Sequence, residues 1–322
     1  MTTTVVPDFG VRVKFNTTIK VDDTHVDFVR DHLSDLFKLT PAQRLTYKKQ
    51  LPCSQPTSLT RTDFKKCDLS TYMFTPKADG TRYYMVFISM QGIPICMAID
   101  RAYNMFPLDV DAPDVLFNGT VLDVELMSEH LGLVMDVLQL EGQSMVKTPF
   151  FKRYKALQPV IDSITTHAPT ALKLECKCVL FNLCLATLNS QPYSKDGIIL
   201  QPQRGMCGIG RVHNLYRVKN HETIDVVYRD GKYYAWQSGK PLDISERVQC
   251  KAPPEHDGLY EFTVTLPKRG AKNSPLRLIV SVQRTDKLEP NDVSVLLRLR
   301  EILRDTISPQ DLLNAVLPPP LK

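Results

Sequence analysis

The chain has 322 residues, of which 43% are hydrophobic and 23% are charged. This composition is typical of a folded globular protein and excludes global disorder, and the length allows two domains. The net charge of +5 fits a partner that carries phosphates, although many basic proteins have no such partner. Because no run approaches the ~20 apolar residues of a membrane span and no signal peptide is recognisable, we expect no membrane partner and a location in the cytoplasm, the nucleus or, for a viral protein, the virion.

The first half of the chain predicts helices followed by strands. Apolar residues recur at helical spacing from Val26 to Phe37, and Thr40-Pro41 predicts the N-cap and the first residue of a second helix. Short β-rich runs separated by turn residues then follow at Tyr83–Ser89, Ile93–Ile99, Ala102–Leu108, Val121–Met127 and Gly132–Leu140. A strand about every ten residues predicts an antiparallel meander.

The second half predicts a change of architecture. Thr148-Pro149 opens a helix that Pro159 is expected to kink or interrupt. Two more strands are expected at Asp196–Leu200 and Asn214–Val218, after which Asp230-Gly231 predicts a hairpin. We therefore expect an α+β fold, with a large α+β domain at residues 1–222 and a small β-barrel domain with terminal helices at residues 223–322.

The segment Lys77-Ala78-Asp79-Gly80-Thr81-Arg82 is the first candidate for chemistry. A lysine nucleophile must lose its proton before it attacks, and neighbouring cations together with desolvation make that loss easier. Gly80 permits a close backbone approach, and Arg82 presents donors suited to ribose or phosphate oxygens. Taken alone, the segment is also compatible with a turn between solvated charges.

Further blocks follow in a fixed order. They are Asp100-Arg101, Leu122-Asp123-Val124-Glu125-Leu126, Ser194-Lys195-Asp196-Gly197-Ile198-Ile199-Leu200, Leu215-Tyr216-Arg217-Val218-Lys219 and Arg284-Thr285-Asp286-Lys287. In order and spacing, from about residue 51 to 291, the blocks resemble the motifs of the covalent nucleotidyltransferases. That superfamily comprises the mRNA capping guanylyltransferases and the ATP-dependent DNA and RNA ligases.

Three features resemble the capping branch rather than the ligases. They are the upstream stretch Leu51-Pro52-Cys53-Ser54-Gln55-Pro56, the block Ile99-Asp100-Arg101, and the form Arg284-x-Asp286-Lys287-x-x-Pro290-Asn291 of the last motif. The length and motif spacing are most similar to those of compact viral capping enzymes. The resemblance implies a ligase-like domain of antiparallel sheets with helices, followed by an OB-fold barrel.

The resemblance also implies a role for each charged residue. Lys77 would form the phosphoramidate to GMP, while Arg82 and Glu125 would hold the ribose. Arg101 would face the phosphates. Asp196, together with Glu125, would bind Mg²⁺ or Mn²⁺ as the metal cofactor.

The remaining motif residues would hold the phosphates. Arg217 and Lys219 would bind the α-phosphate of GTP. The last motif would orient the leaving pyrophosphate through Arg284, Asp286 and Lys287.

Guanine recognition is less sharply defined. A lysine before the Asp196 motif reads guanine O6 in this family, and Lys173 falls nearest the expected distance, with Lys177 as the other candidate. The family usually has an aromatic residue that stacks on the base, whereas this chain offers Met135 and Ile198.

The implied function is that of a GTP:mRNA guanylyltransferase, which transfers GMP to the 5′-diphosphate end of RNA. Nothing in the sequence resembles an RNA triphosphatase or a cap methyltransferase, so we expect separate proteins for those steps, and RNA polymerase is a further candidate partner. Two alternatives stay open: an ATP-dependent polynucleotide ligase, and an inactive scaffold of the same fold that binds RNA or a polymerase.

Overall fold

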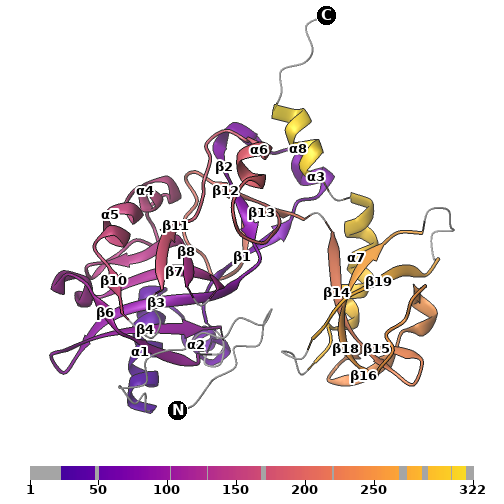
Figure 1. Cartoon of the computed structure of the whole chain (residues 1–322), viewed down its shortest axis with the longest axis horizontal. Coiled ribbons are helices and arrows are strands. Elements are labelled where there is room, and N and C mark those ends of the chain that lie inside the picture. The colour runs from indigo at the N-terminus through magenta and orange to yellow at the C-terminus, as the bar shows by residue number, and fades with distance from the viewer. Residues whose placement is uncertain are drawn as a thin grey trace, which may run out of the picture. The chain divides into compact units, whose positions relative to one another are not determined.

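The computed structural model describes residues 23–47, 51–101, 103–128, 130–167, 172–219, 221–267, 274–284, 289–305 and 307–316. The chain divides into two compact units, shown in Figure 1. Unit 1 contains the described residues up to Thr57 and Asp68–Arg217, and unit 2 contains Ser58–Cys67 and the described residues from Val218 onward. The units therefore part a few residues earlier than the 222/223 boundary that we expected from sequence.

The early segment Ser58–Cys67 belongs to unit 2 for reasons that the sequence pattern does not reveal. The Ser58 hydroxyl donates to Oε1 of Glu222 at 3.4 Å. The Arg61 guanidinium lies 3.8 Å from Oδ2 of Asp311. Both partners come from the C-terminal part of the chain, so tertiary contacts assign this segment to unit 2.

The largest sheet of unit 1 has seven strands. Its order is β11 (Lys173–Cys176), β8 (Leu131–Leu140), β7 (Thr120–Ser128), β3 (Thr81–Met90), β4 (Ile93–Asp100) and β5 (Met105–Leu108), with β9 (Gln143–Ser144) paired to β8. The strands lie where the sequence predicts them, but the meander prediction is wrong in its order. β7 pairs with β3 instead of β5, so the β7–β8 hairpin lies on the other side of β3 from β4 and β5.

Both faces of this sheet are covered. Tyr83 and Phe87 of β3 pack in the cluster that contains Leu157 of α5 (Leu157–Asp162), whereas Tyr84 and Val86 pack in the cluster formed with α1 (Asp23–Leu36). Alternate residues of a strand point to opposite faces, which explains why β3 is almost continuously apolar. Figure 1 shows α1 on one side of the sheet, with α5 and its neighbour α4 (Phe150–Lys155) on the other.

The predicted helix after Pro149 is interrupted at Ala156, between α4 and α5. Pro159 lacks the N–H that would bond to the carbonyl of residue 155, so a continuous helix would lose a hydrogen bond at the end of α4. The expected kink or interruption at Pro159 is thus confirmed, and it takes the form of two short helices.

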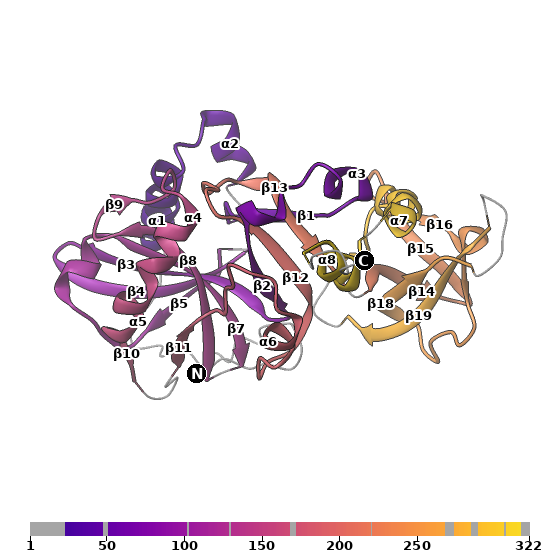
Figure 2. The same ribbon diagram turned by 90° about the horizontal axis from the view of Figure 1, so that it is seen from above.

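A second sheet of unit 1 carries the nucleophile segment. Its order is β1 (Ser54–Ser58), β13 (Gly210–Val218), β12 (Lys195–Pro202) and β2 (Tyr72–Ala78). Figure 2 shows this sheet beside the seven-stranded sheet. The turn at Asp79-Gly80 joins β2 to β3, so the segment from Lys77 to Arg82 begins in one sheet and ends in the other.

Unit 2 is built on a six-stranded sheet. Its order is β16 (Lys240–Asp243), β15 (Lys232–Gln237), β14 (Glu222–Arg229), β18 (Gly258–Thr265), β19 (Leu276–Gln283) and β17 (Val248–Cys250). Val293, Leu296 and Leu299 of α7 (Val293–Asp305) pack into its core. Asp230 and Gly231 join β14 to β15 with φ values of 51° and 76°, which confirms the predicted hairpin. The OB-fold assignment stays a prediction.

The shorter elements complete the described chain. They are α2 (Pro41–Thr46), α3 (Arg61–Phe64), η1 (Leu69–Thr71), β6 (Val110–Asp111), η2 (Asp114–Asn118), β10 (Thr165–Thr166), α6 (Leu185–Asn189), η3 (Ser245–Arg247) and α8 (Pro309–Val316). Thr40 caps α2 in a capping box with Gln43, as Thr40-Pro41 predicts. The fold is α+β, as expected, and within the described ranges the helices are too short or too polar to cross a membrane.

Candidate active site

Lys77 and Asp196 lie together on adjacent strands of the four-stranded sheet. Lys77 is the penultimate residue of β2, and its Nζ lies 3.6 Å from Oδ2 of Asp196 on β12. Both side chains are partly exposed, at 22% and 27%. The backbone N–H of Asp79 donates to the carbonyl of Ser194 at 3.0 Å, which holds the two motifs against each other. The structure thus joins the first and fourth blocks of the sequence at one place.

Gly80 sits where a side chain does not fit. A Cβ at this position would lie 2.4 Å from the carbonyl oxygen of Leu126 and 3.0 Å from Cγ of Glu125. The backbone of the nucleophile segment therefore packs directly on β7, and the glycine is required by close approach. This contact sets the distance between Lys77 and the residues of the seven-stranded sheet.

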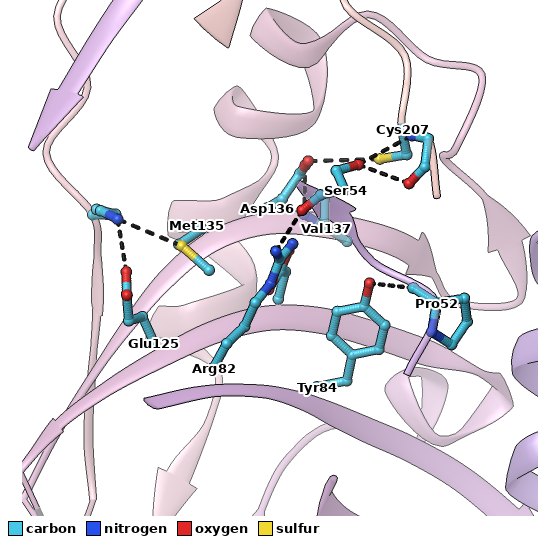
Figure 3. A network of polar contacts seen from close by, with 12 residues as sticks. Pro52, Ser54, Arg82, Tyr84, Glu125, Met135, Asp136, Val137 and Cys207 are labelled. Atoms are coloured by element: carbon cyan, nitrogen blue, oxygen red, sulfur yellow. Dashed lines mark hydrogen bonds and ion pairs between the residues drawn. The ribbon is translucent and has the colours of Figure 1, made fainter. Parts of the chain in front are cut away.

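Arg82 is held by a buried carboxylate and a backbone carbonyl (Figure 3). Its Nε donates to Oδ1 of Asp123 at 2.8 Å, a second guanidinium nitrogen bonds to Oδ2, and the third donates to the carbonyl of Ser54 at 2.6 Å. Burial by itself would lower the pKa of Arg82, but the Asp123 carboxylate outweighs this, and the pKa is raised well above its usual value. The arginine is therefore a fixed cation, and its role toward the ribose stays a prediction.

Glu125, Lys177 and Met135 form a second polar group on the seven-stranded sheet (Figure 3). Nζ of Lys177 donates to Oε2 of Glu125 at 2.8 Å and lies 3.5 Å from Sδ of Met135. The lysine side chain is 5% exposed and the glutamate 14%. The Tyr154 hydroxyl donates to the carbonyl of Lys177 at 2.8 Å and fixes this stretch of backbone. The structure brings together the residues expected to meet the ribose and the base.

The structure places the two lysines considered for guanine recognition in different surroundings, and which of them reads guanine stays a prediction. Lys173 is 73% exposed, pairs with Glu175 at 2.6 Å and lies opposite Leu131 in β8. Lys177 instead follows the end of β11 and contacts Met135 directly. Counting residues from the Asp196 motif did not separate the two, because the distance along the chain does not show where β11 ends.

Replacing Lys177 is expected to alter nucleotide choice, whereas replacing Lys173 is not. Lys177→Ala removes a buried ammonium and leaves Glu125 unpaired, so we expect a loss of GTP affinity on the order of 10- to 100-fold. The measurement is the concentration dependence of covalent labelling with GTP and with ATP. Lys173→Ala is the matched control, and an equal effect of both substitutions would contradict the assignment.

The other predicted site residues of unit 1 are distributed around these two groups. Ile198 is 4% exposed and faces Pro76 in the neighbouring strand, next to Lys77. Arg217 and Lys219 are half-buried at the end of β13, and Arg101 is exposed in the turn after β4. Their roles toward the phosphates stay predictions.

The last motif belongs to unit 2. Arg284 donates to Oε2 of Glu261 at 2.7 Å and to Oδ1 of Asp225 at 3.2 Å, and its side chain is 9% exposed. Asp286 and Lys287 lie outside the described residues. In this structure Arg284 therefore pairs with carboxylates of its own unit, and its predicted role toward pyrophosphate is untested.

Residues 14–221 match the family model for the mRNA capping enzyme catalytic domain. The chain belongs to this family. It is 22% identical over 291 residues to an mRNA-capping enzyme of Caenorhabditis elegans, a match that covers 76% of this chain but 45% of the relative. It is 26% identical over 365 residues to the mRNA-capping enzyme subunit alpha of Candida glabrata, covering 83% of this chain and 80% of that protein.

This capping-enzyme family chain is also similar to chains of solved structures. A mycobacterial DNA ligase D complexed with ATP and MES matches with a TM-score of 0.40 and 13% identity, covering 74% of this chain and 98% of the ligase chain.

Sequence reasoning missed a buried ion pair beside the site. Nε and a terminal nitrogen of Arg153 each donate to one Asp136 oxygen at 2.7 Å, and the arginine side chain is 1% exposed. Arg153 also donates to the carbonyls of Thr148 and Gly205. Burial raises the pKa of Asp136, and the bonds from Arg153 act against that rise. A charged residue amid the apolar stripe Phe150–Ile161 was the available signal.

The two arginine–aspartate pairs lie side by side. Asp123 and Asp136 face each other across β7 and β8, and each carboxylate has its own arginine. The arginines reach the carbonyl of Ser54, the first residue of β1, and the carbonyl of Gly205, which lies between β12 and β13. Together the pairs connect the sheet that carries Glu125 to the segments that border the sheet carrying Lys77.

The carboxylates near Lys77 fit a metal ion that is also held by the phosphates of a nucleotide. Among the described residues there is no group of three or more histidine, cysteine, aspartate or glutamate side chains able to hold an ion. Mg²⁺ is commonly held by one or two carboxylates together with substrate phosphates and water. Asp196, partly exposed beside Lys77, can supply one such carboxylate, whereas Glu125 is engaged by Lys177.

Proposed function

We propose that this chain is a GTP:mRNA guanylyltransferase that forms a covalent lysyl-GMP intermediate. The observation that carries the proposal is Lys77 beside Asp196 at the junction of two sheets, within a stretch that matches the capping enzyme catalytic domain. The matched relatives are named mRNA-capping enzymes or their subunit alpha, which supports the same reaction class.

In the first half-reaction the deprotonated Nζ of Lys77 attacks the α-phosphorus of GTP. A P–N bond forms while the P–O bond to pyrophosphate breaks, so pyrophosphate leaves with the displaced electron pair. Lys177 and Glu125 orient the nucleoside, and Arg217 and Lys219 hold the α-phosphate. Because these groups come from rigid strands or strand ends, they align the phosphorus with the nucleophile before the reaction.

A divalent cation, Mg²⁺ or Mn²⁺, would be held by Asp196 and would neutralise charge on the phosphates when bound. In the structure Asp196 lies 3.6 Å from the Lys77 amine. A carboxylate beside the amine also attracts a metal cation that approaches the same place. Asp196 is therefore suited to a site in which its charge is shared with a cation during the reaction.

In the second half-reaction a terminal oxygen of a 5′-diphosphate RNA attacks the same phosphorus. The P–N bond breaks, Lys77 regains its proton, and the product is a 5′–5′ triphosphate cap. Removal of the RNA γ-phosphate and methylation of the cap would come from separate proteins, and the name "subunit alpha" of the fungal relatives supports the existence of a partner. RNA polymerase is a further proposed partner.

Covalent labelling tests the proposal directly. The protein is incubated with a divalent metal and α-labelled GTP or ATP, denatured and examined for label on the chain. We expect label from GTP alone, loss of label when the metal is chelated, and release of the label as capped product on addition of 5′-diphosphate RNA. Label from ATP alone would instead indicate a polynucleotide ligase, and label from neither nucleotide would support an inactive scaffold.

A further inference from the structure

Tyr193 has a buried hydroxyl whose proton has no hydrogen-bond acceptor in the part of the chain that the structure describes. A buried polar group left unpaired is unfavourable, and such groups in native proteins commonly have a functional reason. Lys195 lies beside the Tyr193 ring. Nζ of Lys195 lies 5.9 Å from the ring centroid and donates to the carbonyls of Gln191 and Tyr193 at 2.8 and 3.2 Å.

Two observations place Tyr193 near the candidate site: its position along the chain and the charges around its hydroxyl. Its neighbour Ser194 accepts the hydrogen bond from Asp79 of the nucleophile segment, and Asp196 follows two residues later. Burial raises the pKa of Tyr193, the negative charge of Glu125 raises it further, and a hydrogen bond from the backbone of Cys178 acts against that rise. The phenol is therefore neutral, keeps its proton and lies in the electrostatic neighbourhood of the glutamate expected to bind ribose.

A ribose hydroxyl can form hydrogen bonds with both the Glu125 carboxylate and the Tyr193 phenol. A hydroxyl donates one hydrogen bond and accepts others, whereas an ionised carboxylate only accepts. If a ribose hydroxyl donates to Glu125, its oxygen remains free to accept from a phenol. A neutral tyrosine near that carboxylate supplies the required donor, which explains why its proton has no acceptor before a nucleotide binds.

We propose that the Tyr193 hydroxyl donates a hydrogen bond to the ribose hydroxyl of GTP that Glu125 accepts, so that Tyr193 is a further nucleotide-binding residue. This inference rests on the proposed function, because it assumes that Glu125 meets the ribose. It makes Tyr193 a residue that distinguishes ribonucleotides from deoxynucleotides. The site then loses affinity for a nucleotide that lacks this hydroxyl, since the phenol is left without its acceptor.

The test measures binding separately from chemistry. Tyr193→Phe is placed in a Lys77→Ala background, in which GTP binds without reacting, and dissociation constants are obtained by isothermal titration calorimetry with Mg²⁺ and GTP, 2′-deoxy-GTP or 3′-deoxy-GTP. We expect Tyr193→Phe to weaken GTP binding about 3- to 10-fold. With one of the two deoxy analogues the loss should disappear, because the hydroxyl that Tyr193 contacts is already absent.

A matched control is available in the same unit. Tyr103 also has a buried hydroxyl without a hydrogen-bond partner in the described residues. It packs in the cluster that α1 forms with Tyr84 and Val86 of the seven-stranded sheet. Tyr103→Phe makes the same chemical change and should leave all three dissociation constants unchanged.

The inference is overturned if Tyr193→Phe binds GTP as tightly as its parent, or if it weakens GTP and both deoxy analogues equally. Failure of the parent to bind GTP overturns it as well. Labelling of the wild-type chain is a separate measurement, so a labelled wild type with an unaffected Tyr193→Phe variant rejects this inference while the proposed function stands.

Discussion

Lys77→Ala is expected to abolish covalent labelling by GTP, with a loss on the order of 10³-fold or more. The amine nitrogen is the atom that bonds to phosphorus, and the carboxylate of Asp196 beside it cannot form this P–N bond. Lys77→Arg should be equally inactive, because a guanidinium keeps its proton. The measurement is label retained on the denatured chain after incubation with α-labelled GTP and metal.

Lys155→Ala is the control for this result. Lys155 is an exposed lysine at the end of α4, and its loss should leave labelling unchanged. GTP binding to the Lys77→Ala chain should persist, since the lysine contributes to chemistry more than to recognition. Undiminished labelling of Lys77→Ala would place the nucleophile elsewhere and reject the mechanism.

Arg153→Ala is expected to destabilise unit 1 more than any surface substitution. It removes an arginine that is 1% exposed and leaves the Asp136 carboxylate buried without its bidentate partner. Breaking a buried ion pair in this way costs about 3–5 kcal/mol of unfolding free energy. For a domain of this size the melting temperature should fall by about 6–20 °C. Thermal unfolding followed by circular dichroism measures the shift.

Two further variants separate the causes of this loss. Arg153→Met combined with Asp136→Leu removes both charges and should recover most of the stability, because no unpaired charge remains. Arg44→Ala breaks a pair with Asp35 in which the side chains are 39% and 74% exposed, and it should cost about 1 kcal/mol or less. If Arg153→Ala and Arg44→Ala were equally mild, the buried pair would contribute no more than an exposed one.

Much of the local structure follows from patterns within a few residues. The hairpin at Asp230-Gly231, the capped start of α2 and the break near Pro159 each depend on backbone chemistry that the residue itself brings. The strands of unit 1 were likewise predicted, because apolar runs and turn residues are local signals. The strand order was not, since the pairing of β7 with β3 depends on contacts between residues far apart in the chain.

For the candidate site, too, some features follow from the sequence and others only from the folded structure. The sequence by itself determined Lys77 as the expected nucleophile, because its segment suits a reactive lysine and the ordered motifs around it resemble those of the covalent nucleotidyltransferases. Only the tertiary structure decided that Lys177 rather than Lys173 meets Glu125, and that Arg153 supports Asp136. These are buried contacts between distant segments. Their physical basis is desolvation and hydrogen-bond geometry, which depend on the folded chain and leave no periodic trace in the sequence.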